Sequence, residues 1–317
     1  MSDTTPELAT VFPGQGSQAV GMMAEWRGEA TVTATFREAS EALGYDLWAL
    51  VTEGPAEELD RTDRTQPAIL TASTALWRLW QERGGAEPAA MAGHSLGEYS
   101  ALVAAEALSL YDAVALVADR GRYMQEAVPA ESGAMTAVIG LADERVAEVC
   151  ASAAQGQVVQ PVNYNAPGQV VIAGERDAVE RAGEAAKEAG AKRVMPLPVS
   201  APSHCSLMQP AAERLAARLE AVEIGEPRRR VLHNADLSVS SDAEAIRQRL
   251  VEQLARPVRW TETIQRMASE GAQTVAECGP GKVLTGLCRR IDRGLQGVAL
   301  SDPEAFDDAL GHFRAAS

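Results

Sequence analysis

The sequence predicts an α/β protein with two domains, and three observations support this fold class. The chain of 317 residues is about twice the length of a common single domain. Short apolar runs alternate with helical patterns on both sides of a middle segment, which indicates a mostly parallel sheet covered by helices. The middle segment, about 130–198, instead follows the order β-α-β-β-α-β of a ferredoxin-like subdomain.

The main domain is expected to contain short buried strands, each followed by turn residues. The first strand ends at Pro13 and Gly14, a pair that opens a loop. The helices are recognised by apolar residues spaced three and four positions apart, and glycines mark several of their ends. The expected strands are 8–12, 89–92, 231–234 and 274–277, and the expected helices are 66–83, about 98–107, 111–127, 208–222, 242–254, 261–270 and 282–291.

The inserted segment carries its own pattern of short strands and two helices. A turn at 165–168, Asn-Ala-Pro-Gly, separates its two central strands. The expected strands are 134–139, 158–163, 169–173 and 192–197, and the expected helices are 143–154 and 177–189. We therefore predict a discontinuous catalytic main domain, 1–129 and 199–317, and a ferredoxin-like subdomain at 130–198.

Charge and composition exclude several classes of protein. With 29 Lys and Arg against 44 Asp and Glu, the net charge is −15, which disfavours nucleic acid as a partner. The most apolar long stretch, 101–118, contains two acidic residues and fits a buried helix better than a membrane span. The first ten residues lack the pattern of a secretory signal. The four cysteines form no C-x-x-C pair, so we expect reduced thiols, no metal and a cytoplasmic location.

The segment Gly93-His94-Ser95-Leu96-Gly97 matches the G-x-S-x-G pattern of a nucleophile elbow. It follows a short apolar strand and opens a helix, which is the context that this motif requires. A tight turn of this kind exposes the serine oxygen and leaves the next backbone N–H free for an oxyanion. We therefore expect Ser95 to be a nucleophile in a main domain like that of the α/β-hydrolases.

A serine hydroxyl needs a base at neutral pH, and the chain offers four histidines. His204 lies in a loop where the chain returns from the inserted subdomain, and functional residues favour loops held by rigid elements. His233 closes an expected strand and is the alternative. His94 adjoins the serine and should point elsewhere, and His312 lies in a polar helix near the C-terminus.

Two further segments are open to more than one interpretation. Pro13-Gly14-Gln15-Gly16-Ser17 is either an ordinary glycine-rich turn or a loop whose backbone N–H groups bind an anion. Neither this segment nor Gly279-Pro280-Gly281-Lys282 has the spacing of a nucleotide-binding loop. Arg120 would, on its own, be read as a surface cation.

Several blocks taken together resemble the bacterial malonyl-CoA:acyl carrier protein transacylases. They occur in the order of that family and span residues 11 to about 291. The matching blocks are 11–18, 93–102, 120–125, 165–171, 200–205, 253–254 with 257–260, and 279–284.

This resemblance implies a ping-pong acyl transfer without a cofactor or metal, catalysed by a monomer. Ser95 would attack the thioester of malonyl-CoA while His204 accepts its proton, and the malonyl group would then pass to the phosphopantetheine thiol of acyl carrier protein. The oxyanion would be held by the N–H groups of Gln15 and Leu96. A carbonyl near Gln253 would orient the histidine in place of an acid. Arg120, with Gln253 and Asn165, would bind the malonyl group, Arg120 through a bidentate contact to its carboxylate.

An acidic carrier protein must dock on this acidic enzyme through a local basic patch. Arg289 and Arg290 are the first choice, with Arg293 and Lys282 nearby, and Lys192 with Arg193 is the second. The alternative interpretation is that these are ordinary solvated charges.

Two rival functions remain open at this stage. A serine esterase or thioesterase shares the elbow, but its catalytic histidine usually lies late in the sequence. In such an enzyme His233 or His312 would be the candidate base. An acyltransferase that serves a polyketide pathway would use the same chemistry with another carrier. Leu96 and Ser203 are the residues in which a methylmalonyl-preferring form would be expected to differ.

Overall fold

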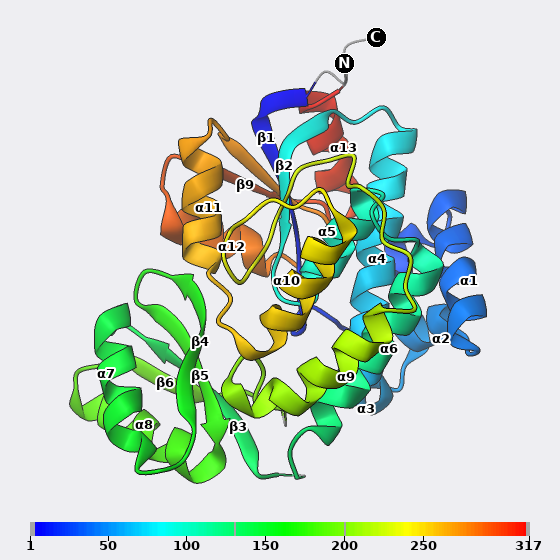
Figure 1. Ribbon diagram of the computed structural model, residues 1–317. Coiled ribbons are helices and arrows are strands. Elements are labelled where there is room, and N and C mark those ends of the chain that lie inside the picture. Colours follow the sequence, from blue (N-terminus) through cyan, green and yellow to red (C-terminus); the bar gives the residue numbers. More distant parts are fainter. Residues whose placement is uncertain (1–3, 130, 200, 315–317) are drawn as a thin grey trace.

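The computed structural model describes residues 4–129, 131–199 and 201–314, which form a larger layered unit and a smaller one below it (Figure 1). The larger unit is built on a parallel sheet with the strand order β7-β2-β1-β8-β9. Its strands are β1 (Thr4–Phe12), β2 (Glu87–Gly93), β7 (Val231–Leu232), β8 (Thr274–Glu277) and β9 (Gln296–Ala299). All pairs run parallel, so the carboxyl ends of the strands meet at one edge, where α/β proteins bind ligands.

Helices cover both faces of this sheet. On one face, apolar side chains of β1 and β2 pack against α1, α4, α5, α6, α9, α10 and α13. On the other face, α11 and α12 cover the sheet through Trp260, Ile264 and Leu287. The helices are α1 (Ala30–Leu43), α2 (Leu47–Glu53), α3 (Ala56–Leu59), α4 (Thr62–Glu82), α5 (Gly97–Ala104), α6 (Leu110–Glu126), α9 (Gln209–Leu219), α10 (Ala243–Ala255), α11 (Trp260–Ser269), α12 (Val283–Ile291) and α13 (Pro303–His312), with 3-10 turns at Ala24–Trp26 and Ser206–Met208.

The smaller unit is an antiparallel sheet with two helices on one face. Its elements are β3 (Gly133–Ile139), α7 (Asp143–Ala154), β4 (Val159–Ala166), β5 (Gln169–Glu175), α8 (Arg176–Glu188) and β6 (Arg193–Pro196). The strand order β4-β5-β3-β6 is that of the ferredoxin-like arrangement expected from the sequence. The predicted division of the domains begins at residue 130, which lies outside the described residues, so the boundaries themselves stay a prediction.

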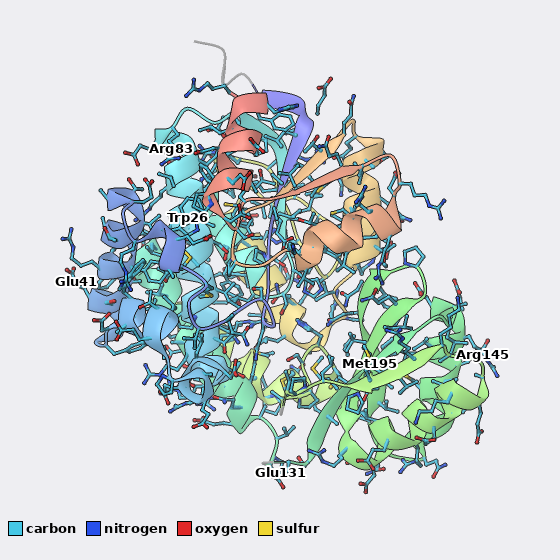
Figure 2. All side chains as sticks on the ribbon, turned by 180° about the vertical axis from the view of Figure 1, so that it is seen from behind. Trp26, Glu41, Arg83, Glu131, Arg145 and Met195 are labelled. Carbon is cyan, nitrogen blue, oxygen red and sulfur yellow. The ribbon has the colours of Figure 1, made fainter. Side chains whose placement is uncertain are left out.

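The two faces of the smaller sheet have different partners. Val138, Val170 and Ile172 point toward α7 and α8 and are buried there. Met135, Ala137 and Val171 belong to a second cluster that includes Cys205 of the larger unit. Figure 2 shows Arg145 on the outer side of this unit, away from the parallel sheet. The inner face of the smaller sheet therefore faces the larger unit.

Two expectations about elements need correction. The strand predicted at 231–234 ends at Leu232, so His233 and Asn234 lie beyond it at the carboxyl edge of the sheet. The helix predicted at 66–83 begins one turn earlier, at Thr62, and includes Pro67 within it. The helices between residues 30 and 59 are not anticipated by the sequence analysis.

The turn between β2 and α5 depends on glycine at two positions. A Cβ on Gly93 would lie 1.8 Å from the carbonyl carbon of Gly97, and a Cβ on Gly97 would lie 2.1 Å from the carbonyl oxygen of Phe12. Real Cβ atoms do not approach backbone atoms so closely. The strand, the turn and the helix can therefore pack together only without side chains at these positions.

We expect Gly97→Ala to lower the free energy of unfolding by about 1–3 kcal/mol or more, because its methyl group forces β1 and α5 apart. Denaturant unfolding measures this change. Gly286→Ala is the matched control, because nothing lies within 4 Å of a Cβ at that helical position, and it should be neutral or stabilising by up to about 1 kcal/mol. Equal stability of the two variants would contradict the close packing of the turn.

Candidate active site

Ser95 is held in a strained turn between β2 and α5. Its φ angle is 52°, a left-handed conformation that costs a non-glycine residue about 1–3 kcal/mol. The side chain of Asn234 holds the turn from both sides, because its Oδ1 accepts the Ser95 N–H at 2.7 Å and its Nδ2 donates to the Gly93 carbonyl at 2.6 Å. The chain thus fixes the direction in which the serine hydroxyl points.

His204 forms a dyad with Ser95. Its Nε2 lies 2.7 Å from Ser95 Oγ, and its Nδ1 lies 2.7 Å from the backbone carbonyl of Gln253. A carbonyl can only accept a hydrogen bond, so Nδ1 carries the proton and Nε2 of the neutral ring accepts from the serine hydroxyl. His204 also has a positive φ, 67°, so both members of the dyad sit in constrained backbone.

The surroundings of His204 keep its imidazole neutral. Burial, together with the nearby cation of Arg120, lowers the pKa of His204 from 6.5 to about 3. The hydrogen bond to the Gln253 carbonyl opposes this shift without reversing it. At neutral pH the ring is therefore ready to accept a proton from Ser95.

Gln15 and Leu96, the two residues expected to form the oxyanion hole, line the same cavity as Ser95. Leu96 precedes the first residue of α5, and Gln15 lies in the loop after β1. Within the described part of the chain, neither of their backbone N–H groups donates a hydrogen bond to another backbone or side-chain atom. Free donors beside a nucleophile are what an oxyanion hole requires.

Arg120 places a buried cation beside the nucleophile. It lies on α6, its side chain is only 1% exposed, and its Nη2 lies 3.3 Å from Ser95 Oγ. Nη1 donates to Gln66 Oε1 at 2.8 Å, and Nη2 donates to Gln253 Oε1 at 3.0 Å. The surface pairing that would be assumed for an isolated arginine is therefore wrong here.

These groups meet in one small cavity of about 100 Å³. Met135 and Leu197 of the smaller unit close it on one side, and Met124 of α6 adds another apolar surface. The polar residues that line it are Gln15, His94, Ser95, Arg120, Asn163, Ser203 and His204. A cavity of this size and charge suits a short acyl group that ends in an anion.

Several residues singled out from the sequence lie elsewhere. Asn165 is not among the residues that line the cavity; its Oδ1 lies 2.7 Å from Nε2 of His94, whereas Asn163 does line the cavity. His233 Nδ1 lies 2.7 Å from the carboxylate of Glu98, so it is not placed as a base for Ser95. Arg289 and Arg290 lie exposed on α12.

Three residues that support the site were missed by sequence reasoning: Gln66, Glu98 and Asn234. Glu98 and Asn234 carried a usable signal, because one lies within the elbow block and the other follows a strand of the parallel sheet. Gln66 carried none. Its contact to Arg120 joins residues 54 positions apart.

Metal and disulfide chemistry find no support among the described residues. Residues 4–129, 131–199 and 201–314 contain no group of three or more His, Cys, Asp or Glu side chains arranged to hold a metal ion. All four cysteines are buried and unpaired. Over the same ranges, no helix combines the length and the apolar character needed to span a membrane.

Comparison with known proteins places this geometry in a family. A family model described as an acyl transferase domain matches residues 10–298. A malonyl CoA-acyl carrier protein transacylase from Salmonella typhimurium is 57% identical over 305 residues, which cover 96% of this chain and 99% of the relative. The crystal structure of an acyl carrier protein S-malonyltransferase from Vibrio cholerae superposes with a TM-score of 0.94 at 57% identity, covering 95% of this chain and 99% of that one. A malonyl-transacylase in complex with its type II PKS acyl-carrier protein gives a TM-score of 0.95 at 55% identity, covering 96% and 99%.

Proposed function

The chain belongs to the malonyl-CoA:acyl carrier protein transacylases of the acyl transferase family, and we propose that Ser95 carries the malonyl group between the two carriers. The enzyme transfers malonyl from malonyl-CoA to acyl carrier protein. The observation that carries the assignment of residues is the buried guanidinium of Arg120, 3.3 Å from Ser95 Oγ in the same cavity. We place the activity in the cytoplasm, in the supply of malonyl units for fatty acid elongation.

In the first half-reaction, Ser95 Oγ attacks the thioester carbon of malonyl-CoA while His204 Nε2 takes the hydroxyl proton. The N–H groups of Leu96 and Gln15 stabilise the tetrahedral oxyanion. The carbon–sulfur bond then breaks, His204 returns the proton to the coenzyme A sulfur, and a malonyl-serine ester remains. In the second half-reaction the phosphopantetheine thiol gives its proton to His204 and attacks the ester. The bond between the acyl carbon and Ser95 Oγ then breaks, His204 gives its proton to Ser95 Oγ, and the malonyl thioester of the carrier is released.

The low pKa of His204 suits a thioester substrate. A weakly basic imidazole forms an unstable imidazolium, which returns its proton readily to the leaving sulfur. A thiol is a far better leaving group than the amine of a peptide, so the dyad needs no carboxylate behind the histidine. No step requires a redox cofactor, ATP or a metal.

Arg120 selects the substrate by its charge. Its planar guanidinium can form two parallel hydrogen bonds to the malonyl carboxylate. A neutral acetyl group displaces water from this buried cation and leaves it unpaired, which costs on the order of 2–5 kcal/mol. Malonyl is therefore favoured over acetyl by roughly 30-fold to several-thousand-fold.

Arg120→Ala should lose malonyl transfer while keeping or gaining acetyl transfer, because it removes the cation that pairs with the malonyl carboxylate and leaves Ser95 and His204 in place. Acylation of the enzyme by malonyl-CoA and acetyl-CoA, followed by intact mass, measures both rates. Arg122→Ala is the control, since that side chain lies on the same helix, is 53% exposed and pairs with Asp119. An equal loss with both substrates would exclude the selective role.

The rate of acylation should stay nearly constant from pH 8 down to about pH 5. His204 must be neutral to act as a base, and its pKa is lowered to about 3. The active form is therefore lost only as the pH falls toward that value. Rapid-quench acylation by malonyl-CoA, with tryptophan fluorescence to verify that the protein is folded, provides the test. A fall centred near pH 6.5 would show that the histidine has an ordinary pKa.

For the carrier protein, we propose a basic docking surface made of Arg289 and Arg290 on α12 with Lys192 and Arg193 on the smaller unit. All four are exposed, and in the described part of the chain none of them forms an ion pair. Arg290 donates to Gln169 at 2.9 Å. Gln169 and Arg193 both pair with Ile139 in the smaller sheet. Arg290 thus contacts the smaller sheet, in which Arg193 lies across β3 from Gln169. Together the two basic segments offer an acidic carrier positive charge on an enzyme of net charge −15.

The double charge reversal Arg289→Glu with Arg290→Glu should raise the Michaelis constant for the carrier protein by roughly fivefold or more, because the acidic partner is repelled. Hydrolysis of malonyl-CoA should be spared, since the dyad is untouched. Arg145→Glu with Lys187→Glu makes the same charge change on the outer helices α7 and α8 and should leave the constant unaltered. Equal constants in the two double variants would refute this docking surface.

A further inference from the structure

Arg120 is a buried cation without a direct carboxylate partner. Its guanidinium donates to two amide oxygens and to the serine hydroxyl, and within the described residues it forms no ion pair. A buried cation is costly unless an anion lies near. The charge balance of the site must therefore come from further away.

The nearest compensating charge in the network is Glu98. This residue lies in the first turn of α5 and is fully buried. Its Oε2 accepts from the Asn234 N–H at 3.0 Å and from Gln253 Nε2 at 2.7 Å, and its Oε1 lies 2.7 Å from His233 Nδ1. Carboxylate oxygens that receive several N–H groups are stabilised in the ionised form.

The side chain of Gln253 joins this anion to the cation. Its Nε2 donates to Glu98, while its Oε1 accepts from Arg120 at 3.0 Å. The reverse orientation would place an NH₂ group against the guanidinium and a carbonyl against the carboxylate, so the amide can lie only one way. The positive NH₂ end of the amide dipole thus faces the anion, and its negative oxygen end faces the cation. Burial lowers the pKa of Arg120, and Tyr99 and then Glu98 oppose this effect.

We propose that Glu98 is a positioning residue that determines specificity, because its carboxylate compensates Arg120 through the Gln253 amide and sets how strongly the cavity prefers an acyl group with a carboxylate. The inference rests on the proposed role of Arg120 in binding the malonyl group. The Glu98 carboxylate forms no hydrogen bond with Arg120, Ser95 or His204 within the described residues, and only the Glu98 backbone N–H contacts the dyad, by donating to the Ser95 carbonyl at 3.0 Å. The charge of Glu98 therefore acts on the substrate through the Gln253 amide.

The direction of the effect follows from the charges. With Glu98 ionised, Arg120 is partly neutralised before the substrate arrives. Without that negative charge the guanidinium attracts the malonyl carboxylate more strongly, and an acetyl group leaves a less compensated cation behind. The preference for malonyl over acetyl should therefore rise when the charge of Glu98 is removed.

Glu98→Gln removes this charge and can keep the hydrogen bonds. The amide oxygen introduced by the substitution can take the place of Oε2 and accept from Asn234 and Gln253. The introduced NH₂ group can donate to His233 Nδ1 if the imidazole carries its proton on Nε2, an atom that has no partner in the structure. The variant therefore tests charge and leaves the shape of the network unchanged.

The measurement is the ratio of the second-order rate constants for acylation of Ser95 by malonyl-CoA and by acetyl-CoA. In Glu98→Gln this ratio should rise roughly tenfold, as expected for one charge acting across a bridging side chain. A change in the serine, the histidine or the oxyanion hole affects the rate constants for both substrates, so it cancels in their ratio. Glu126→Gln, an exposed carboxylate on α6 that pairs with Arg214, should leave the ratio unchanged.

Gln253→Glu is a second variant, and it should change the ratio of the rate constants in the opposite direction. Two carboxylates at positions 253 and 98 would share one proton, which moves the negative charge into contact with Arg120, so the malonyl preference should fall. This variant decides the question if Glu98→Gln does not fold.

A ratio within about twofold of the wild-type value in a folded Glu98→Gln or Gln253→Glu protein would overturn the proposal. Arg120→Ala is measured in parallel. If it abolishes the malonyl preference while Glu98→Gln has no effect, only the proposed role of Glu98 is contradicted. If Arg120→Ala leaves the preference unchanged, the proposed role of Arg120 in binding the malonyl group is contradicted.

Discussion

The buried guanidinium of Arg120 is the constraint on which the rest of the active site depends. It lies 3.3 Å from the nucleophile, where, in the function that we propose, it attracts the carboxylate of the acyl group to the point of reaction. The same charge helps to lower the pKa of His204 and so keeps the general base neutral. A cation in that position also requires oriented acceptors, which Gln66 and Gln253 supply. The buried polar network is thus built around this one charge, which also adds to the effect of burial on the pKa of His204.

The fold brings these groups together because parallel strands end at one edge. β1 leads to Gln15, β2 leads to Ser95, and β7 leads to Asn234, so the proposed oxyanion donor, the proposed nucleophile and the support of its turn come from three neighbouring strands. The smaller sheet lies over this edge and contributes Met135 and Asn163 to the wall of the cavity. The cavity of about 100 Å³ is therefore lined by residues of both units.

Much of the fold could be predicted from the sequence, because periodicity and turn residues are local signals. The order of elements in the smaller unit is an example. The elbow at Ser95 is also local, and the position of His204 in a loop favours it over the other histidines. The role expected of Arg120 comes only from the family resemblance, because an arginine in a helix carries no sign of what it faces. Glu98 and Asn234 act through contacts between residues 136 positions apart, which no local pattern encodes. The resemblance places Asn165 in the site, and in the structure its side chain contacts His94, which lines the cavity.

The central chemical claim is that Ser95 holds the malonyl group between two carriers. Intact mass after brief incubation with malonyl-CoA, and again after addition of phosphopantetheinylated acyl carrier protein, tests it most directly, with Ser95→Ala as the control. We predict that the enzyme gains one malonyl group, that Ser95→Ala gains none, and that the group then moves to the carrier. Malonyl lost to water at the same rate with and without the carrier would contradict the transfer and indicate a thioesterase.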